Sequence, residues 1–134
     1  MFRLSKPKRR PVQTSIGPGV FVPDTKHGET LEVRRYHRGA VIDFCWHPSL
    51  PTAQQVPEVA AAIQTYIDRA LDMIDADEQF RAAVIEQSGI YPISVYWGRD
   101  DCEFALAFGY VGWDDGILRF FFRNGEIIRT DVSD

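Results

Sequence analysis

Hydrophobic and polar residues alternate through Glu29–Trp46 on both sides of Arg38-Gly39. Alternation with a period of two predicts a half-buried strand, and a glycine-containing pair between two such runs predicts a hairpin. With Arg38-Gly39 as a two-residue turn, Val33 lies opposite Phe44. The same register gives two further pairs, Leu31 with Trp46 and Arg34 with Asp43. One face then carries Leu31, Val33, Ile42, Phe44 and Trp46, and the other carries Glu32, Arg34, Asp43 and Cys45.

A helical period replaces this alternation after the hairpin and predicts a long helix. Its start lies between two signals, because Thr52 with Gln55 forms a capping-box pattern whereas Pro57 favours the first turn. The apolar positions at helical spacing are Val56, Val59, Ala60, Ile63, Tyr66, Ile67, Ala70, Leu71 and Ile74.

A shorter helix is expected from about Asp77 to Ser88. Asp77 is a favourable N-cap residue, and Gly89 is a favourable stop after the last turn. The inward positions of this helix are Phe80, Val84 and Ile85.

The chain beyond the helices alternates again and predicts four strands. Ile93–Trp97 and Cys102–Tyr110 are joined by Gly98–Asp101, which places Val95 opposite Phe104 and Ile93 opposite Leu106. The reverse face of the second strand carries small residues, which leave room for a close neighbour: Ala105, Ala107 and Gly109.

The last two strands, Ile117–Arg123 and Glu126–Val132, flank Asn124-Gly125. Asn-Gly is the strongest short hairpin signal, because both residues tolerate the positive φ of a tight turn. This turn predicts two pairs, Arg123 with Glu126 and Phe121 with Ile128.

Taken together, these elements predict an α+β fold in the order ββ-αα-ββββ: an antiparallel β-sheet of hairpins with two helices packed on one face. Residues 14–134 are expected to form a single domain, since a chain of 134 residues supports one hydrophobic core. Residues 1–13 show no periodicity and are expected to be a flexible basic tail. After the tail, Gly19–Val22 is the one short stretch that fits an edge strand.

The distribution of charge along the chain indicates which kinds of partner to expect. The net charge is −4, but residues 1–13 hold five of the 15 basic residues and no acidic one, which leaves residues 14–134 with a net charge of −9. An acidic body repels nucleic-acid phosphates and attracts basic partners, so a basic protein is the expected partner and nucleic acid is not.

Composition also bears on location. The longest apolar runs, Val59–Ile63 and Phe104–Phe108, are far shorter than the roughly 20 residues that span a bilayer, so no membrane partner is expected. The two cysteines, Cys45 and Cys102, lack the paired spacing of a metal or redox motif. We therefore expect a reduced, cytoplasmic protein without a cofactor.

Acidic side chains suggest the candidate binding site. Trp113 lies in the expected loop Gly112–Gly116 beside Asp114 and Asp115, where an amphipathic aromatic residue is a plausible interface anchor. Antiparallel connectivity brings this loop to the same sheet end as the chain terminus. Asp114, Asp115, Asp131 and Asp134 then form one acidic rim around Trp113, and Asp100, Asp101 and Glu103 form a second cluster at the other end. Such rims steer basic partners.

A catalytic alternative starts from the strand face shared by Asp43, Cys45 and His47. A thiol activated by an imidazole needs a direct hydrogen bond, but side chains two apart on a strand lie about 7 Å from each other. The competing hypothesis is a small enzyme or ligand-binding domain with a pocket between helices and sheet, near Tyr36 and these three residues. A third is a structural or adaptor subunit, detectable as a homodimer formed through a strand edge. The metal motifs HExxH, CxxC and the calcium loop are absent from the sequence.

A small, acidic α+β chain that contains the segment GWDDGILRFFFRNGEII resembles, at the level of a class, the immunity proteins of bacterial polymorphic-toxin and secretion systems. This resemblance implies a non-catalytic, stoichiometric inhibitor that blocks a cognate toxin. It carries over no functional residue.

Overall fold

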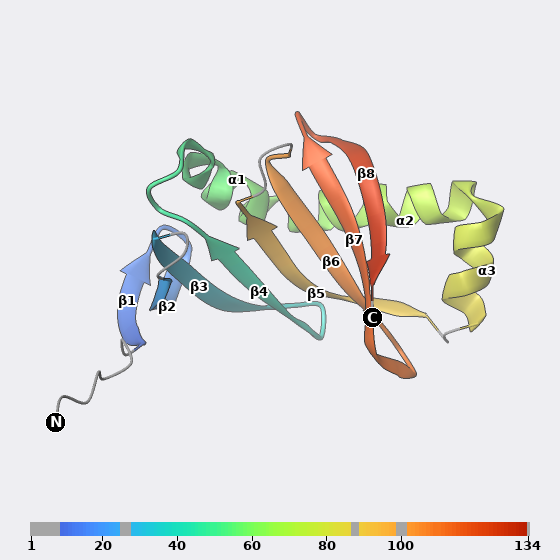
Figure 1. The fold of residues 1–134 in the computed structure, drawn as a ribbon, viewed down its shortest axis with the longest axis horizontal. Coiled ribbons are helices and arrows are strands. Elements are labelled where there is room, and N and C mark those ends of the chain that lie inside the picture. Colours follow the sequence, from blue (N-terminus) through green and yellow to red (C-terminus); the bar gives the residue numbers. More distant parts are fainter. Residues whose placement is uncertain (1–8, 25–27, 87–88, 99–101, 134) are drawn as a thin grey trace, which may run out of the picture.

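The protein is an α+β chain built on a mostly antiparallel eight-stranded sheet (Figure 1). The computed structural model describes residues 9–24, 28–86, 89–98 and 102–133. In the sheet the strands lie in chain order from β1 to β8, and only β4 and β5 run parallel. The strands are β1 (Arg10–Thr14), β2 (Gly17–Asp24), β3 (Gly28–His37), β4 (Ala40–Trp46), β5 (Ile90–Trp97), β6 (Phe104–Tyr110), β7 (Trp113–Arg123) and β8 (Glu126–Ser133).

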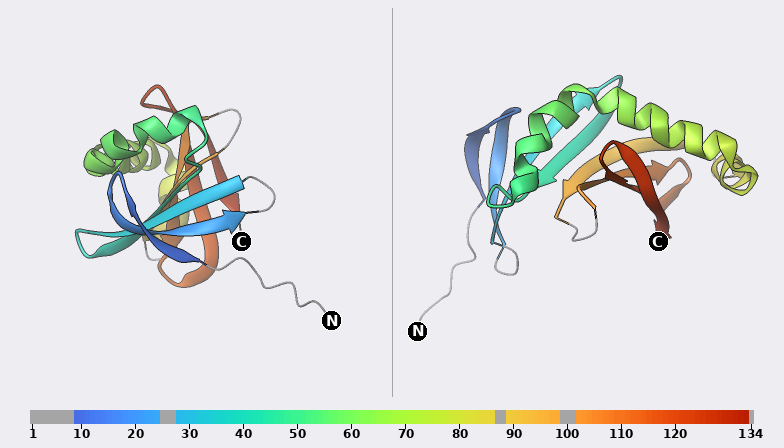
Figure 2. Two further views of the ribbon diagram at one scale, coloured as in Figure 1. Left: turned by 90° about the vertical axis from the view of Figure 1, so that its left-hand side faces the viewer. Right: turned by 90° about the horizontal axis from the view of Figure 1, so that it is seen from above.

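The helices form the crossover that joins the two parallel strands. They are a 3-10 turn at Pro51–Gln55, α1 (Val56–Ala61), α2 (Ile63–Ala76) and α3 (Glu78–Glu86). Seen from above, α1 and α2 run along one side of the sheet (Figure 2). A parallel connection needs such a long crossover, whereas the antiparallel neighbours are joined by short connections.

The β3–β4 hairpin has the predicted register throughout. Val33 pairs with Phe44 and Arg34 pairs with Asp43 across the Arg38-Gly39 turn. Both turn residues have positive φ, 48° and 81°, as a type I′ turn requires. Val33, Ile42, Phe44 and Trp46 are buried, so this face belongs to the core.

The long predicted helix is divided in two at Ala62, whose φ and ψ of −104° and 20° leave the helical region. The capping box of Thr52 and Gln55 is wrong, since no side chain caps either of the first two helical segments. Pro57 does lie in the first turn of α1, as predicted.

The cap of the last helix is confirmed. Asp77 Oδ1 accepts hydrogen bonds from the backbone N–H groups of Gln79 and Phe80, at 2.9 and 3.0 Å. Phe80 packs against the core, as predicted. The side chains of Val84 and Ile85, together with residues 87–88, lie outside the described part of the chain.

The β5–β6 register differs from the prediction by two residues. Val95 pairs with Leu106 and Trp97 with Phe104, so the connection runs from Gly98 to Glu103 rather than to Asp101. A shift of two preserves the face of every side chain, because the side-chain period of a strand is two. Val95, Phe104 and Leu106 therefore still share the core face.

The β7–β8 hairpin is confirmed at its turn and corrected beyond it. Asn124 and Gly125 have φ of 52° and 79°, and Arg123 pairs with Glu126. The predicted pair of Phe121 with Ile128 is wrong, since Phe121 pairs with Arg129. A β-bulge between Phe121 and Phe122 adds a residue on β8 and shifts the pairing.

An N-terminal hairpin, β1–β2, was not predicted. It includes Arg10–Gln13, which the sequence places in the flexible tail, whereas residues 1–8 lie outside the described part. Gly19 lets β2 approach β3 closely, because a Cβ there would lie 2.6 Å from the Glu32 carbonyl oxygen. The element order is accordingly ββββ before the helices and ββββ after them.

Aromatic side chains dominate the core between the sheet and α1–α2. Phe104 and Phe122 stack with ring centroids 5.0 Å apart, and Tyr66 of α2 meets both edge-on at 5.1 and 5.2 Å. Edge-to-face and offset pairs of this kind add to the energy of burial. This cluster joins α2 to the C-terminal half of the sheet.

Candidate functional site

The sheet face turned away from α1 and α2 carries the candidate site, and we call it the open face. Its side chains alternate with the core residues along each strand. It consists of Glu32, Arg34, Asp43, Cys45, Ser94, Tyr96, Ala105, Ala107, Arg119, Phe121, Arg129 and Asp131. Figure 1 views the molecule with the sheet in front of the helices.

A pocket of about 520 Å³ lies in the middle of this face. It straddles the parallel junction of β4 and β5, where Cys45 pairs with Tyr96, and extends across β6 to β7. Its lining residues are Cys45, Ser94, Tyr96, Gly98, Ala105, Ala107 and Arg119. The volume lies within the range of roughly 300–1,000 Å³ of small-ligand sites.

Small side chains make the floor of the pocket. Ala105 and Ala107 are 4% and 6% exposed and lie opposite Tyr96 and Ser94. The hollow exists because these positions of β6 carry a single methyl group where their neighbours carry larger side chains. Beyond them Gly109 is covered, since a Cβ there would lie 2.7 Å from the ring of Tyr91.

Arg119 supplies the cationic wall. Its Nη1 donates to Asp131 Oδ1 at 3.1 Å and to Ser133 Oγ at 2.7 Å. Its Nε and Nη2 make no hydrogen bond to another described residue. One edge of the guanidinium is thus fixed by β8, and the other retains donors for a bound group.

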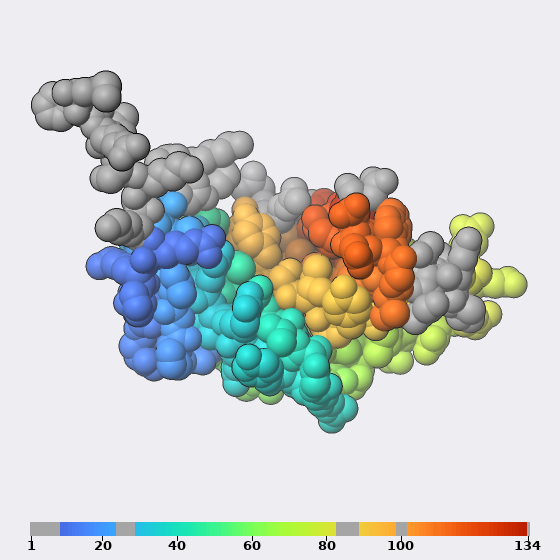
Figure 3. Space-filling view, turned by 90° about the horizontal axis from the view of Figure 1, so that it is seen from below, coloured from blue at the N-terminus to red at the C-terminus, as the bar shows by residue number. Residues whose placement is uncertain are grey.

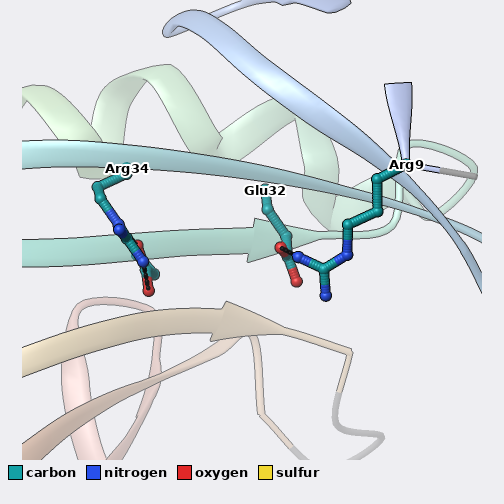
Figure 4. A network of polar contacts seen from close by, with 4 residues as sticks. Arg9, Glu32 and Arg34 are labelled. Carbon is teal, nitrogen blue, oxygen red and sulfur yellow. Dashed lines mark hydrogen bonds and ion pairs between the residues drawn. The ribbon is translucent and has the colours of Figure 1, made fainter. Parts of the chain in front are cut away.

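Further charged pairs flank the pocket on the β3–β4 side. Arg34 Nε donates to Asp43 Oδ1 at 2.9 Å, and Arg9 Nη1 lies 3.7 Å from Glu32 Oε2. Figure 4 shows Arg34 and Glu32 pointing to the same side of the hairpin. The hydrogen bond and charge of Asp43 raise the pKa of Arg34. The open face therefore presents fixed pairs of opposite charge.

Cys45 lies at the pocket as an unreactive thiol. Burial, followed by the negative charges of Glu32 and Asp43, raises its pKa to about 12. The thiolate is the nucleophilic form of cysteine, so at neutral pH this side chain is a protonated, weakly polar part of the wall. This disfavours the catalytic use of Cys45 considered from the sequence.

His47 packs behind the pocket rather than in it. It is 4% exposed, and its ring meets Tyr96 edge-on at 6.4 Å. Its Nδ1 lies 3.4 Å from both Thr30 Oγ1 and the Glu29 carbonyl oxygen. The catalytic alternative expected Asp43, Cys45 and His47 to converge, but Asp43 pairs with Arg34 and only Cys45 lines the pocket.

A hollow of about 40 Å³ lies between the helices and the β3–β4 hairpin, where the alternative placed a ligand pocket, and Tyr36, Ala60 and Ile63 are among its lining residues. Tyr36 itself is 81% exposed. The ligand-sized hollow near Cys45 lies on the other face of the sheet.

Trp113 is not a free interface anchor. It begins β7 instead of lying in a loop, and its ring packs on Tyr110 at 5.4 Å against the core. The ring lies directly over Gly116, where a Cβ would be 2.3 Å from Trp113 Cε3. The expected loop Gly112–Gly116 is mostly an irregular stretch of β7, whose pairing jumps between Gly109 and Tyr110.

The acidic residues predicted as rims lie only partly within the described residues. Asp114 and Asp115 are exposed, but Asp131 pairs with Arg119 on the open face, opposite the core face where Trp113 packs. Glu103 Oε1 accepts a hydrogen bond from the backbone N–H of Asn124 at 2.8 Å and so holds the β7–β8 turn. The remaining predicted residues, Asp100, Asp101 and Asp134, lie outside the described part.

Sequence reasoning missed most of the pocket, namely Ser94, Tyr96, Gly98 and Arg119. The available signal was the small-residue alternation of Ala105 and Ala107, which by itself predicts room for a close neighbour. Among the described residues, no three His, Cys, Asp or Glu side chains gather as metal ligands, and no helix is long and apolar enough to cross a membrane.

Comparison with protein-family models, with curated proteins and with solved structures finds no match to this chain.

Proposed function

We propose that this chain is a non-catalytic binding protein that holds a segment of a protein partner on its open face, as an inhibitor of the immunity type does. The observation that carries the proposal is the pocket of about 520 Å³ set between charged pairs that the fold already fixes. Interfaces gain most of their energy where an anchor side chain fills a desolvated pocket inside a polar rim. The open face offers both a pocket for an anchor side chain and a polar rim around it.

The chemistry of the flanks supports a polypeptide partner. Arg34–Asp43 lies on one side of the pocket and Arg119–Asp131 on the other, so both rims offer a donor and an acceptor. An extended polypeptide segment with alternating polar groups can contact the charged pairs on both sides of the pocket. The acidic body, with a net charge of −9 over residues 14–134, favours a partner that is basic overall.

A cytoplasmic location belongs to the same proposal. Cys45 and Cys102 are both thiols and not halves of a disulfide, which fits a reducing compartment. A chain that neutralises a toxin inside the producing cell has to be present there before the toxin acts.

Filling the pocket tests the proposal. Ala107→Trp places a large ring on the floor, and Thr65→Trp adds the same ring at an exposed position of α2 as a matched control. Calorimetry and size-exclusion chromatography against the product of the neighbouring gene should show a one-to-one complex that Ala107→Trp weakens by about 100-fold or more. The control should bind like the wild type.

Two results would count against the proposal. One is the absence of a complex with the wild-type chain, and the other is equal binding by both tryptophan variants. Charge reversal at Asp114 and Asp115 separates the two surfaces: if it weakens binding and Ala107→Trp does not, the exposed carboxylates form the interface and the open face does not.

A small-molecule site is the second candidate, because the pocket has the volume of one and Arg119 keeps Nε and Nη2 for a carboxylate or phosphate. Thermal unfolding of the wild type and Ala107→Trp in the presence of organic anions tests it. An anion that stabilises only the wild type supports a ligand site. Equal shifts in both chains would indicate binding elsewhere.

A further inference from the structure

The two edges of the sheet are built differently. β1 is five residues long and contains Pro11, which cannot donate a ladder hydrogen bond. Short length and proline are devices that protect an edge from pairing. β8 spans eight residues, Glu126–Ser133, and contains no proline. β8 is the last strand of the sheet, and among the described strands only β7 pairs with it, so its outer edge faces no described strand.

Apart from Glu126 at the β7–β8 turn, the exposed side chains of β8 fall into two kinds. Arg129 and Asp131 are exposed on the open face, where Arg129 also lies over Phe121 at 4.2 Å. Ile128 and Val132 are exposed apolar residues, at 38% and 53%. The bulge lies before Arg129, and from Arg129 to Ser133 the strand pairs regularly with β7. The regular part thus carries one cation and one anion two residues apart.

Two copies of one strand pair antiparallel when a two-fold axis that runs through the sheet relates them. Side chains of the open face then stay on one face of the joined sheet only if the axis passes through a residue position and not between two residues. An axis at Arg129 sets arginine against arginine, and an axis at Asp131 sets aspartate against aspartate. An axis at Thr130 places Arg129 of each copy opposite Asp131 of the other. The same register brings Ile128 opposite Val132.

We propose that β8 is a homodimer interface in which two copies pair antiparallel about Thr130 to form one continuous sheet. Opposite charges directly across an antiparallel pair are favourable and like charges are unfavourable, so this register is selected over its neighbours. The interface differs from the pocket, and the inference does not depend on the proposed function.

The test uses charge reversal in both directions. Arg129→Asp gives a chain with two aspartates at positions 129 and 131, and Asp131→Arg gives a chain with two arginines. Each variant alone should dimerise about tenfold or more weakly than the wild type in analytical ultracentrifugation. An equimolar mixture should regain the dimer as a heterodimer, because both cross-strand pairs are then of opposite charge.

Arg38→Asp, at the exposed β3–β4 turn, is the matched control and should dimerise like the wild type. Circular dichroism checks that each variant folds, since Asp131→Arg also removes the partner of Arg119. A wild type that stays monomeric at 100 µM, or folded variants whose mixture does not form heterodimers by native mass spectrometry, would overturn the proposal.

Discussion

Replacing Gly116 by alanine tests whether Trp113 is a fixed part of the core. Gly116 has no positive φ, so alanine introduces no backbone strain, and only the added methyl group matters. This methyl would lie 2.3 Å from Trp113 Cε3 and 2.5 Å from Cδ2. The ring has to move by about 1 Å or more to restore ordinary van der Waals contact.

The expected cost follows from these contacts. Overpacking a well-packed site costs about 1–3 kcal/mol, and losing the tilted ring contact of Trp113 with Tyr110 costs about 0.5–1.5 kcal/mol more. We therefore expect Gly116→Ala to lower the free energy of unfolding by about 2–4 kcal/mol. Urea unfolding followed by circular dichroism measures this, and the near-ultraviolet spectrum reports the change around Trp113.

Repeating the substitution in a Trp113→Ala variant shows whether the cost comes from contact with the Trp113 ring. In Trp113→Ala the indole is gone, so Gly116→Ala should cost less there, with the Tyr110 ring at 2.8 Å as the next obstacle. The reasoning is refuted if Gly116→Ala changes stability by less than about 0.5 kcal/mol in the wild type, or costs the same in both backgrounds. Trp113 would then be mobile enough to act as the anchor that the sequence suggests.

Three further predictions concern single side chains. Between pH 9 and 12 the free energy of unfolding should fall as pH rises, because the unfolded thiol loses its proton near pH 9 whereas folded Cys45 keeps it to about pH 12. In denaturation series at several pH values, Cys45→Ala should reduce this slope by up to about 1.4 kcal/mol per pH unit. An unchanged slope would contradict the raised pKa of Cys45. Glu103→Ala should cost about 0.5–1.5 kcal/mol in urea unfolding, because the Asn124 N–H loses its acceptor, whereas Glu103→Gln retains an oxygen and should cost less. Asp77→Ala should cost about 1 kcal/mol and increase hydrogen exchange in α3, and Asp77→Ser should restore most of the loss.

Local chemistry explains which parts of the fold the sequence predicts well. The β3–β4 register follows from a two-residue turn and a strict alternation, and both are properties of adjacent residues. The Asn124-Gly125 turn is of the same kind. Errors appear where an irregularity intervenes, as at the bulge next to Phe121, because a bulge leaves no mark in a pattern of alternating residues.

The N-terminal hairpin shows another limit. Prolines and glycines interrupt its alternation, and these residues ordinarily indicate loops. In the structure Gly19 serves a close approach of two strands, which depends on a neighbour that is distant in sequence. Tertiary pairing thus overrides the local preference of this segment.

The side chain of Asp131 shows a related limit. Connectivity alone places this residue at one end of the sheet, but its carboxylate binds Arg119 on the neighbouring strand β7. The pocket could not be predicted because it combines residues from β4, β5, β6 and β7 whose spacing depends on the curvature of the sheet. Strand patterns report which face a residue occupies, and they do not report how the face is bent.

The parallel junction of β4 and β5 has a mechanical consequence. On each side of it the strands are joined to their neighbours by short connections, whereas the pairing across it involves, among the described residues, Asp43–Cys45 and Ser94–Tyr96. The space-filling view shows the β3–β4 hairpin and β5 meeting along this junction (Figure 3). The pocket lies across it, so an occupant that touches both Cys45 and Ala107 fastens the two halves of the sheet to each other. An occupied pocket therefore also opposes separation of β4 from β5. Hydrogen exchange along β4 and β5 should slow whenever the pocket is filled.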